Sequence, residues 1–444
     1  MQNNNDAPYP SRIYAWYVVV LLTIAYAISL LDRWILALMV GPVKDHFGVT
    51  DTEIGLLMGL YFSLFYVTLG LPFGWFADRY NRVKIISLAM FFWCSMTVMC
   101  GLAKNFSQLV FARLGIGLGE AALTPSANSI VTDYFPRSEQ SRAISFLNMG
   151  VAMGMGFAYL IGGWIVSWMM TQPPLTLPIL GALETWQIVF IVAGLPGILV
   201  AALVWTTIRE PRRRERLAKN AHDASVRKCV AYVSANRSAY LPLFLGLVGS
   251  PLVGATLQWL PTLFDRVWGW KTGQFSFAYG CILLIFGPIG AITGGFFITY
   301  LVKQGHKDGP LIASIVAMII LVISTGLLPL ATSPEMALCF LIPSTLSGAM
   351  SAACGAAAML FITPGEFRAQ ISSLYILTIN GLGMLIGPLA IGLLNDQFFT
   401  STDGVRWSLM TVIFAGSGLL TVYLASGRQA YSESVVQLEA AQVR

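Results

Sequence analysis

The chain has 444 residues, of which 56% are hydrophobic and only 11% charged, and its formal net charge is +6. Soluble domains carry about 25% charged residues, so this composition excludes a soluble globular fold and indicates an integral membrane protein. The basic residues lie between apolar segments, which argues against nucleic-acid binding. The 6 cysteines show no CxxC spacing, so neither a metal centre nor a cofactor is predicted.

Twelve apolar segments are long enough, at about 20 residues each, to cross a bilayer as helices. They cover 16–42, 53–77, 84–103, 107–134, 142–170, 186–208, 240–264, 274–302, 310–331, 335–363, 369–395 and 406–427. The first segment is too long for a signal-peptide core and no small-residue cleavage site follows it, so we expect it to be retained. The predicted fold is an all-α membrane protein with twelve transmembrane helices in two six-helix halves.

The longest polar insertion, 209–238, begins REPRRRERLAKNAHDASVRK and separates the two halves. We expect an N-terminal half over 1–208, this basic connector, a C-terminal half over 239–427 and a tail over 428–444. Of the 27 Lys and Arg residues, 20 fall on the side of the N-terminus, 5 on the opposite side and 2 within segments. An excess of Lys and Arg marks the cytoplasmic side, so both termini are predicted to be cytoplasmic.

The fifth and eleventh segments share a pattern of closely spaced glycines. Gly150, Gly154 and Gly156 lie in the fifth segment, and Gly383 and Gly387 occupy corresponding positions in the eleventh. Small residues four apart let helix backbones approach closely, and a pattern shared by both halves indicates an internal repeat. One interpretation of the pattern is close packing alone. The interpretation we favour combines close packing with a sliding surface.

Two motifs suggest a family. The stretch GWFADRYNRVK, residues 74–84, resembles the signature of the major facilitator superfamily, except that Asn81 replaces the usual second glycine. The stretch RLGIGLGEAALTPSANSIVTDYFP, residues 113–136, together with Asp32-Arg33 in the first segment, resembles the Spinster branch of that superfamily. The resemblance implies alternating access by two six-helix halves, without covalent chemistry. It also implies an amphipathic substrate, since Spinster relatives include carriers of sphingosine 1-phosphate and lysophospholipids.

The loop after the second segment has a gating role under this resemblance. Asp78 can face the positive N-terminal end of the eleventh helix, near Arg368. Arg79 and Arg82 can pair with acids at other cytoplasmic helix ends. Such contacts exist only while the cytoplasmic side is closed, so they favour one conformational state. The alternative is that these basic residues only anchor the loop on the cytoplasmic side.

Four ionisable residues lie deep in the first half. At 1.5 Å per residue, Asp32 lies about 24 Å along its helix from Trp16, Glu120 about 20 Å from the cytoplasmic face and Arg113 about 30 Å. Each charge costs roughly 2.5–3.5 kcal/mol at the centre of a membrane helix, so we expect Asp32, Arg33, Arg113 and Glu120 to pair with one another. Pairing alone is one interpretation, and for Arg113 we predict a structural charge pair.

For the other three residues a functional role is the favoured interpretation, because ionisable groups inside membranes mark substrate or proton paths. The guanidinium of Arg33 suits a phosphate or carboxylate head group. In the empty site Arg33 pairs with Glu120 or Asp32; an arriving anion releases the carboxylate, which then takes up a proton. Glu120 is the first candidate for proton coupling and Asp32 the second.

Further substrate contacts are predicted on both halves. No Asp, Glu, Lys, Arg or His is expected inside the second six segments, so that half offers mild polarity and aromatic rings. A cavity with one charged and one mostly apolar wall suits an amphiphile. The further candidate substrate-binding residues, in addition to Arg33 and Glu120, are Tyr61, Asn128, Asn148, Gln258, Trp259 and Asn380.

The predicted function is secondary active transport of an amphipathic organic anion, coupled to protons, by a monomer in the bacterial inner membrane. The expected partners are the lipid bilayer, the small substrate and protons. A proton-coupled carrier of small hydrophilic metabolites or drugs is the alternative, and a passive channel or scramblase explains the polar path less fully. No GxxxxGK[ST] motif is present, which argues against an ATP-driven pump. Without His in a segment, an intramembrane enzyme is disfavoured.

Overall fold

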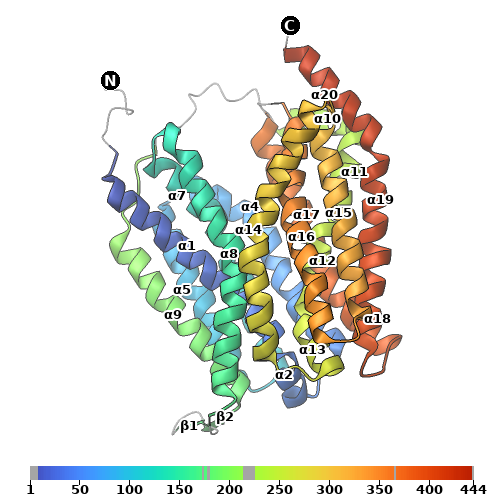
Figure 1. Cartoon of the computed structure of the whole chain (residues 1–444). Coiled ribbons are helices and arrows are strands. Elements are labelled where there is room, and N and C mark those ends of the chain that lie inside the picture. Colours follow the sequence, from blue (N-terminus) through green and yellow to red (C-terminus); the bar gives the residue numbers. More distant parts are fainter. Residues whose placement is uncertain (1–8, 173–174, 178–180, 214–225, 365–366, 443–444) are drawn as a thin grey trace. The chain divides into compact units, whose positions relative to one another are not determined.

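The computed structural model describes residues 9–172, 175–177, 181–213, 226–364 and 367–442 (Figure 1). These residues are almost wholly helical, apart from the antiparallel pair of short strands β1 (Leu175–Leu177) and β2 (Gly181–Leu183). Within the described part of the chain, 11 helical runs are long and apolar enough to cross a membrane. The predicted all-α membrane fold is confirmed.

The helices of the first half are α1 (Arg12–Trp34), η1 (Ile35–Met39), α2 (Val40–Phe47), α3 (Asp51–Met58), α4 (Leu60–Arg79), α5 (Arg82–Gly101), α6 (Phe106–Glu120), α7 (Leu123–Tyr134), α8 (Arg137–Met169) and α9 (Thr185–Thr207). Those of the second half begin with α10 (Val226–Ala235), α11 (Arg237–Leu247), α12 (Gly249–Thr256), η3 (Leu257–Trp259), α13 (Leu260–Trp268) and α14 (Thr272–Lys303). They continue with α15 (Gly309–Leu327), η4 (Leu328–Leu330), α16 (Pro334–Phe361), α17 (Arg368–Gln397), α18 (Gly404–Thr411), the π-helix η6 (Val412–Gly418), α19 (Leu419–Ser426) and α20 (Arg428–Gln442).

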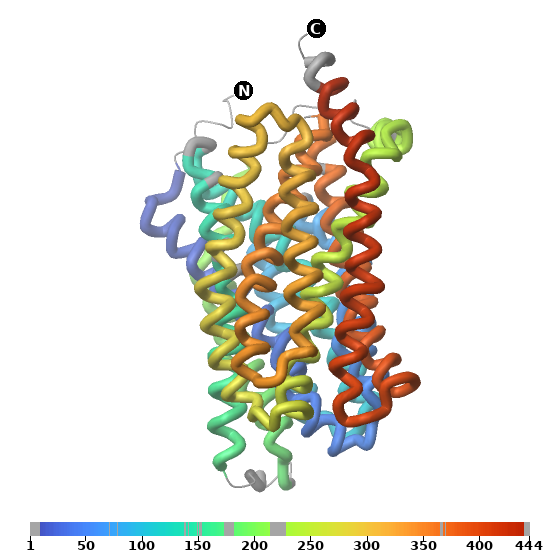
Figure 2. Tube along the Cα trace, turned by 45° about the vertical axis from the view of Figure 1, so that its right-hand side comes forward, coloured from blue at the N-terminus to red at the C-terminus, as the bar shows by residue number. Residues whose placement is uncertain are grey.

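The chain forms two compact units. Unit 1 comprises Met1–Thr50, Leu56–Arg216 and Lys271–Leu284, and unit 2 comprises Asp51–Gly55, Leu217–Trp270 and Ile285–Arg444. Each unit therefore holds one half of the chain and a short segment of the other half, namely the start of α3 in unit 2 and the start of α14 in unit 1. Within unit 1, α1 packs on α8 and α5 on α9 (Figure 1). Within unit 2, α15 packs on α16 and α11 on α19 (Figure 2).

The fourth expected segment, 107–134, is divided between α6 and α7, so it does not form one long helix. The helix α6 ends at Glu120 and α7 begins at Leu123. Pro125 explains the interruption, because it has no N–H to donate to the carbonyl of Ala121 four residues earlier. As a result, Glu120 occupies the last position of α6, next to a break in the backbone hydrogen bonding.

The repeated glycines are packing positions in both units. In unit 1, a methyl group on Gly150 of α8 would lie 2.1 Å from the Cγ2 atom of Thr23 in α1. In unit 2, a methyl group on Gly383 of α17 would lie 2.7 Å from the backbone nitrogen of Leu252 in α12. Both contacts need a residue without a side chain. The predicted close packing is confirmed, and it joins the fifth helix of each half to the first.

Candidate functional site

An ion pair between α1 and α6 lies at the centre of the candidate site. The Nη2 atom of Arg33 donates to Oε2 of Glu120 at 2.6 Å, and the hydroxyl of Ser29 donates to the same oxygen at 2.8 Å. The side chain of Glu120 is 0% exposed, whereas that of Arg33 is 13% exposed. Arg33 can therefore be reached from outside the site, while Glu120 is reached only through its partners.

The other two charges lie beside this pair, also in unit 1. Arg113 donates from Nη1 to the backbone oxygen of Asp32 at 3.2 Å, and the thiol of Cys94 lies 3.8 Å from Oδ2 of Asp32. Asp32 and Arg113 are both 0% exposed. The structure thus brings together the four residues that the sequence predicts to pair. Among these four residues the ion pair joins Arg33 and Glu120, whereas Arg113 contacts the backbone oxygen of Asp32 and not its carboxylate, so the structure does not show the charge pair predicted for Arg113.

The site also contains polar atoms without a partner. Within the described part of the chain, Oε1 of Glu120, Oδ1 of Asp32, Nε of Arg33, and Nε and Nη2 of Arg113 make no hydrogen bond. A buried polar atom without a partner is costly in a low-dielectric interior. The two carboxylate oxygens of Glu120 thus differ, because Oε2 accepts two hydrogen bonds and Oε1 accepts none.

Two aromatic residues of α4 face the same arginine. The Cζ atom of Arg33 lies 4.6 Å from the ring centroid of Phe62 and 4.7 Å from that of Tyr66. The sequence reasoning missed Ser29 and Phe62 as site residues. A signal for Phe62 and Tyr66 was present in the sequence, because two aromatic residues one helical turn apart lie on the same face of a helix.

The remaining predicted substrate residues are distributed over both units. In unit 1, Tyr61 and Asn128 are half-buried and Asn148 is exposed, and Oδ1 of Asn128 has no partner among the described residues. In unit 2, Gln258 is buried and Asn380 half-buried. Trp259 is fully buried and donates from Nε1 to the backbone oxygen of Pro388 at 3.1 Å, which supports a packing role for this residue.

The expectation that the second half carries no ionisable residue in its membrane helices is wrong at several helix ends, including those with Asp265 in α13, Lys303 in α14, Glu335 in α16 and Arg406 in α18. Arg266 lies in α13 and Asp396 in α17, beyond the limits predicted from hydropathy. In unit 2, Arg266 makes a two-pronged ion pair with the buried carboxylate of Asp51, at 2.6 and 2.8 Å. Asp396 accepts from the backbone nitrogens of Asp51 and Thr52, at 3.2 and 2.7 Å, and thereby caps the start of α3.

The predicted gating residues have different surroundings. The guanidinium of Arg79 lies 4.0 Å from the ring centroid of Trp75, and Arg368 is exposed at the first position of α17. The side chain of Asp78 lies outside the described residues. The gating role of these three residues stays a prediction.

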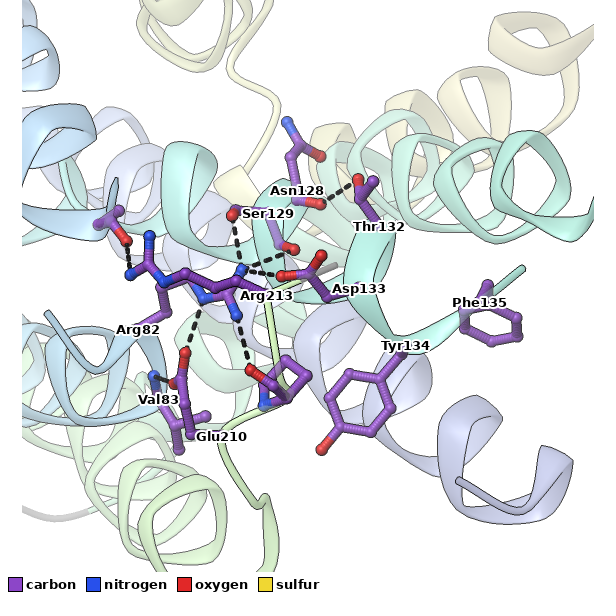
Figure 3. A network of polar contacts seen from close by, with 12 residues as sticks. Arg82, Val83, Asn128, Ser129, Thr132, Asp133, Tyr134, Phe135, Glu210 and Arg213 are labelled. Carbon is purple, nitrogen blue, oxygen red and sulfur yellow. Dashed lines mark hydrogen bonds and ion pairs between the residues drawn. The ribbon is translucent and has the colours of Figure 1, made fainter. Parts of the chain in front are cut away.

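Arg82 occupies a network within unit 1 (Figure 3). It donates from Nη1 to Asp133 at 2.5 Å and to the hydroxyl of Ser129 at 2.8 Å, and from Nε to Glu210 at 2.7 Å. The second carboxylate oxygen of Glu210 accepts from the backbone nitrogen of Val83 at 3.0 Å. Arg82 does pair with acids near helix ends, as expected. Because both acids belong to its own unit, the network ties α5, α7 and the segment after α9 together and supports a structural role.

Replacing Glu210, which follows α9, should lower the stability of unit 1. In Glu210→Gln the charge is lost, and the amide nitrogen that replaces one carboxylate oxygen cannot accept from Arg82 or Val83. We expect a loss of about 1.5–3 kcal/mol in the free energy of unfolding, the value of one charged hydrogen bond. Thermal melting of the purified protein measures it, with the exposed Glu433→Gln as the matched control. Equal melting temperatures for the two variants would contradict the structural role.

The sequence of the chain and its fold identify the family. Residues 22–388 match the model of the Major Facilitator Superfamily, so the chain belongs to this family of membrane transporters, which are not enzymes. The family's fold consists of two six-helix halves, as predicted. The resemblance to this family that the two motifs suggest is confirmed.

Within this family, the chain is similar to one solved structure and to relatives with named substrates. The structure is similar to that of a bacterial homologue of the human lysosomal transporter Spinster, in an inward-facing and unoccupied conformation, with 28% identity and a TM-score of 0.77, covering 97% of this chain and 96% of that one. The sequence is 25% identical to the sphingosine-1-phosphate transporter SPNS2 of Mus musculus over 415 residues, 89% of this chain and 72% of the relative. It is also 26% identical to the D-galactonate transporter of Escherichia coli O6:H1 over 452 residues, 94% of this chain and 97% of the relative.

Proposed function

We propose that this transporter moves an organic anion with an apolar tail, similar to a lysophospholipid or a sphingoid phosphate, together with protons. The observation that carries the proposal is the buried ion pair between Arg33 and Glu120, in which only the arginine is partly exposed. An intramembrane ionisable pair at such a position is a candidate substrate and ion path. Coupling the movement of an anion to that of a proton needs a site whose charges change partners, and this pair can do so.

The proposed cycle uses competition for Arg33. A phosphate or carboxylate accepts hydrogen bonds from the guanidinium in place of Glu120. Glu120, buried and without its cation, then takes up a proton on Oε1, because a buried unpaired carboxylate is strongly disfavoured. Substrate and proton are therefore bound together and released together. Asp32 is the second candidate for the proton, and Arg113 holds the backbone of Asp32 in place.

The relatives support an anionic substrate in two forms. The name of one relative specifies sphingosine 1-phosphate, which is a single-chain amphiphile, and that of another specifies D-galactonate, which is a small hydrophilic carboxylate. Both carry the anionic group that Arg33 suits. We favour the amphiphile because the likeness to a Spinster homologue covers 97% of the chain. The D-galactonate relative, which matches 94% of the chain, makes a small sugar acid the second candidate.

We also propose an orientation in the membrane and a gate on the cytoplasmic side. Both termini and the connector face the cytoplasm of a bacterial inner membrane, as the distribution of Lys and Arg predicts. Asp78, Arg79 and Arg368 act at the cytoplasmic gate, and Arg82 supports the gate loop from within unit 1. Tyr61, Asn128, Asn148, Gln258 and Asn380 contribute polar contacts to the substrate path.

Proteoliposomes with a more acidic exterior test the proposal. We expect a fluorescent lysophosphatidate added outside to become protected from extraction by albumin, beyond its equilibrium share, only while the pH gradient lasts. A protonophore and protein-free vesicles are the controls. Equilibration without accumulation would indicate a scramblase. Gradient-driven accumulation of labelled D-galactonate alone would replace the amphiphile by the second candidate, and no pH-driven accumulation of either would contradict proton coupling.

A further inference from the structure

The ring of Phe62 contacts both arginines of the charge cluster. The Cζ atoms of Arg33 and Arg113 lie 4.6 and 5.7 Å from its centroid. Tyr66, one turn further along α4, lies over Arg33 as well, and its ring stacks on that of Phe62 with centroids 5.4 Å apart and planes inclined at 24°. Phe62 is 0% exposed, so these contacts are made in a desolvated interior.

A glycine of α6 makes this arrangement possible. A methyl group on Gly117 would lie 2.2 Å from the backbone oxygen of Phe62, so α6 approaches α4 closely only because Gly117 has no side chain. Gly117 lies one turn after Arg113 and three residues before Glu120, so all three share a face of α6. The close approach therefore brings the ring of Phe62 beside Arg113 of α6 and Arg33 of α1.

The aromatic contacts matter most when Glu120 carries no charge. In that state Arg33 loses its ion pair, while its attraction to the ring faces is unchanged. We infer that Phe62, assisted by Tyr66, is a positioning residue that holds the guanidinium of Arg33 at the site while Glu120 is protonated. The inference rests on the proposed function for the cycle in which Glu120 changes its charge. The helix α4 thereby has a role in positioning Arg33 that neither the sequence motifs nor the ion pairs indicate.

Fluorinated phenylalanines separate this role from packing. Fluorine withdraws electrons from the ring face with little change of volume, so a packing residue tolerates it and a cation-binding ring does not. Phenylalanine with one, two or three fluorines is placed at position 62, in the wild-type chain and in Glu120→Gln. We expect the melting temperature to fall with each fluorine, and more steeply in Glu120→Gln, where Arg33 has lost its charged partner and depends more on the rings.

Phe190 of α9 supplies the matched control, because it is equally buried in unit 1 and its ring lies near Trp186. Fluorination at position 190 should have the same effect with Glu120 and with Glu120→Gln. Equal slopes in the two backgrounds at position 62 would overturn the inference. This measurement needs no substrate, so it stands even if lysophosphatidate is not transported and the proposed function fails.

Transport supplies a second readout. For the fluorescent lysophosphatidate, we expect KM to rise stepwise and to be about 30-fold higher with three fluorines, the size of a desolvated cation–π contact, while kcat changes less. The ring is retained in every member of the series, so folding is preserved. A KM independent of fluorine number, in a chain that does transport lysophosphatidate, would also overturn the inference.

Discussion

Glu120→Gln is expected to abolish pH-driven accumulation of substrate while substrate exchange across the membrane continues. Glutamine has the shape of glutamic acid and can still accept from Ser29 and Arg33, so the site keeps its structure. It cannot take up a proton, so the substrate no longer moves with one. In proteoliposomes, accumulation should fall to the level of protein-free vesicles at every imposed gradient. Exchange of labelled for unlabelled substrate at equal pH on both sides should persist.

The neighbouring carboxylate gives the control for this experiment. Asp32→Asn removes the second candidate acid, which lies in the same cluster and is equally buried. If Glu120 is the coupling group, pH-driven accumulation survives in Asp32→Asn at a reduced rate. Normal accumulation with unchanged pH dependence in Glu120→Gln would exclude Glu120 as the coupling group, and loss of accumulation in Asp32→Asn alone would assign the role to Asp32.

Arg33→Ala is expected to have the largest effect on stability as well as on substrate affinity. Removing one partner of a buried ion pair leaves the other charge uncompensated, which costs about 3–5 kcal/mol. Here the orphaned group is Glu120, whose side chain is 0% exposed. Thermal melting should therefore show a large loss for Arg33→Ala and a much smaller loss for the double variant Arg33→Ala/Glu120→Gln, because the second change removes the unpaired charge.

The double variant Arg33→Ala/Glu120→Gln allows the loss of substrate affinity to be measured apart from the loss of stability. It is expected to fold yet to bind fluorescent lysophosphatidate about 100-fold more weakly, since a charge-assisted hydrogen bond contributes up to about 3 kcal/mol. Arg33→Lys keeps the charge but not the planar fork, so it should bind with intermediate affinity. Full affinity in the double variant would show that Arg33 does not bind the head group.

The sequence was sufficient for the fold and for the membership of the charge cluster. Apolar segments about 20 residues long define membrane helices, and charges buried in them must pair because desolvation is costly. The limits of the helices were less predictable. Hydropathy excluded Arg266 and Asp396 from the membrane helices, although both lie in helices of unit 2, because a polar residue at a helix end lowers the local hydropathy.

What the amino-acid sequence determined by itself is a membrane transporter with paired charges in its first half, because composition and the cost of burying charge do not depend on how helices rotate against one another. Only the tertiary structure decided that Arg33 and Ser29 both bind Oε2 of Glu120 and that the ring of Phe62 lies beside two arginines. These contacts join α1, α4 and α6. They depend on the rotation of each helix and on a glycine that permits close approach, and neither can be determined from the segments one at a time.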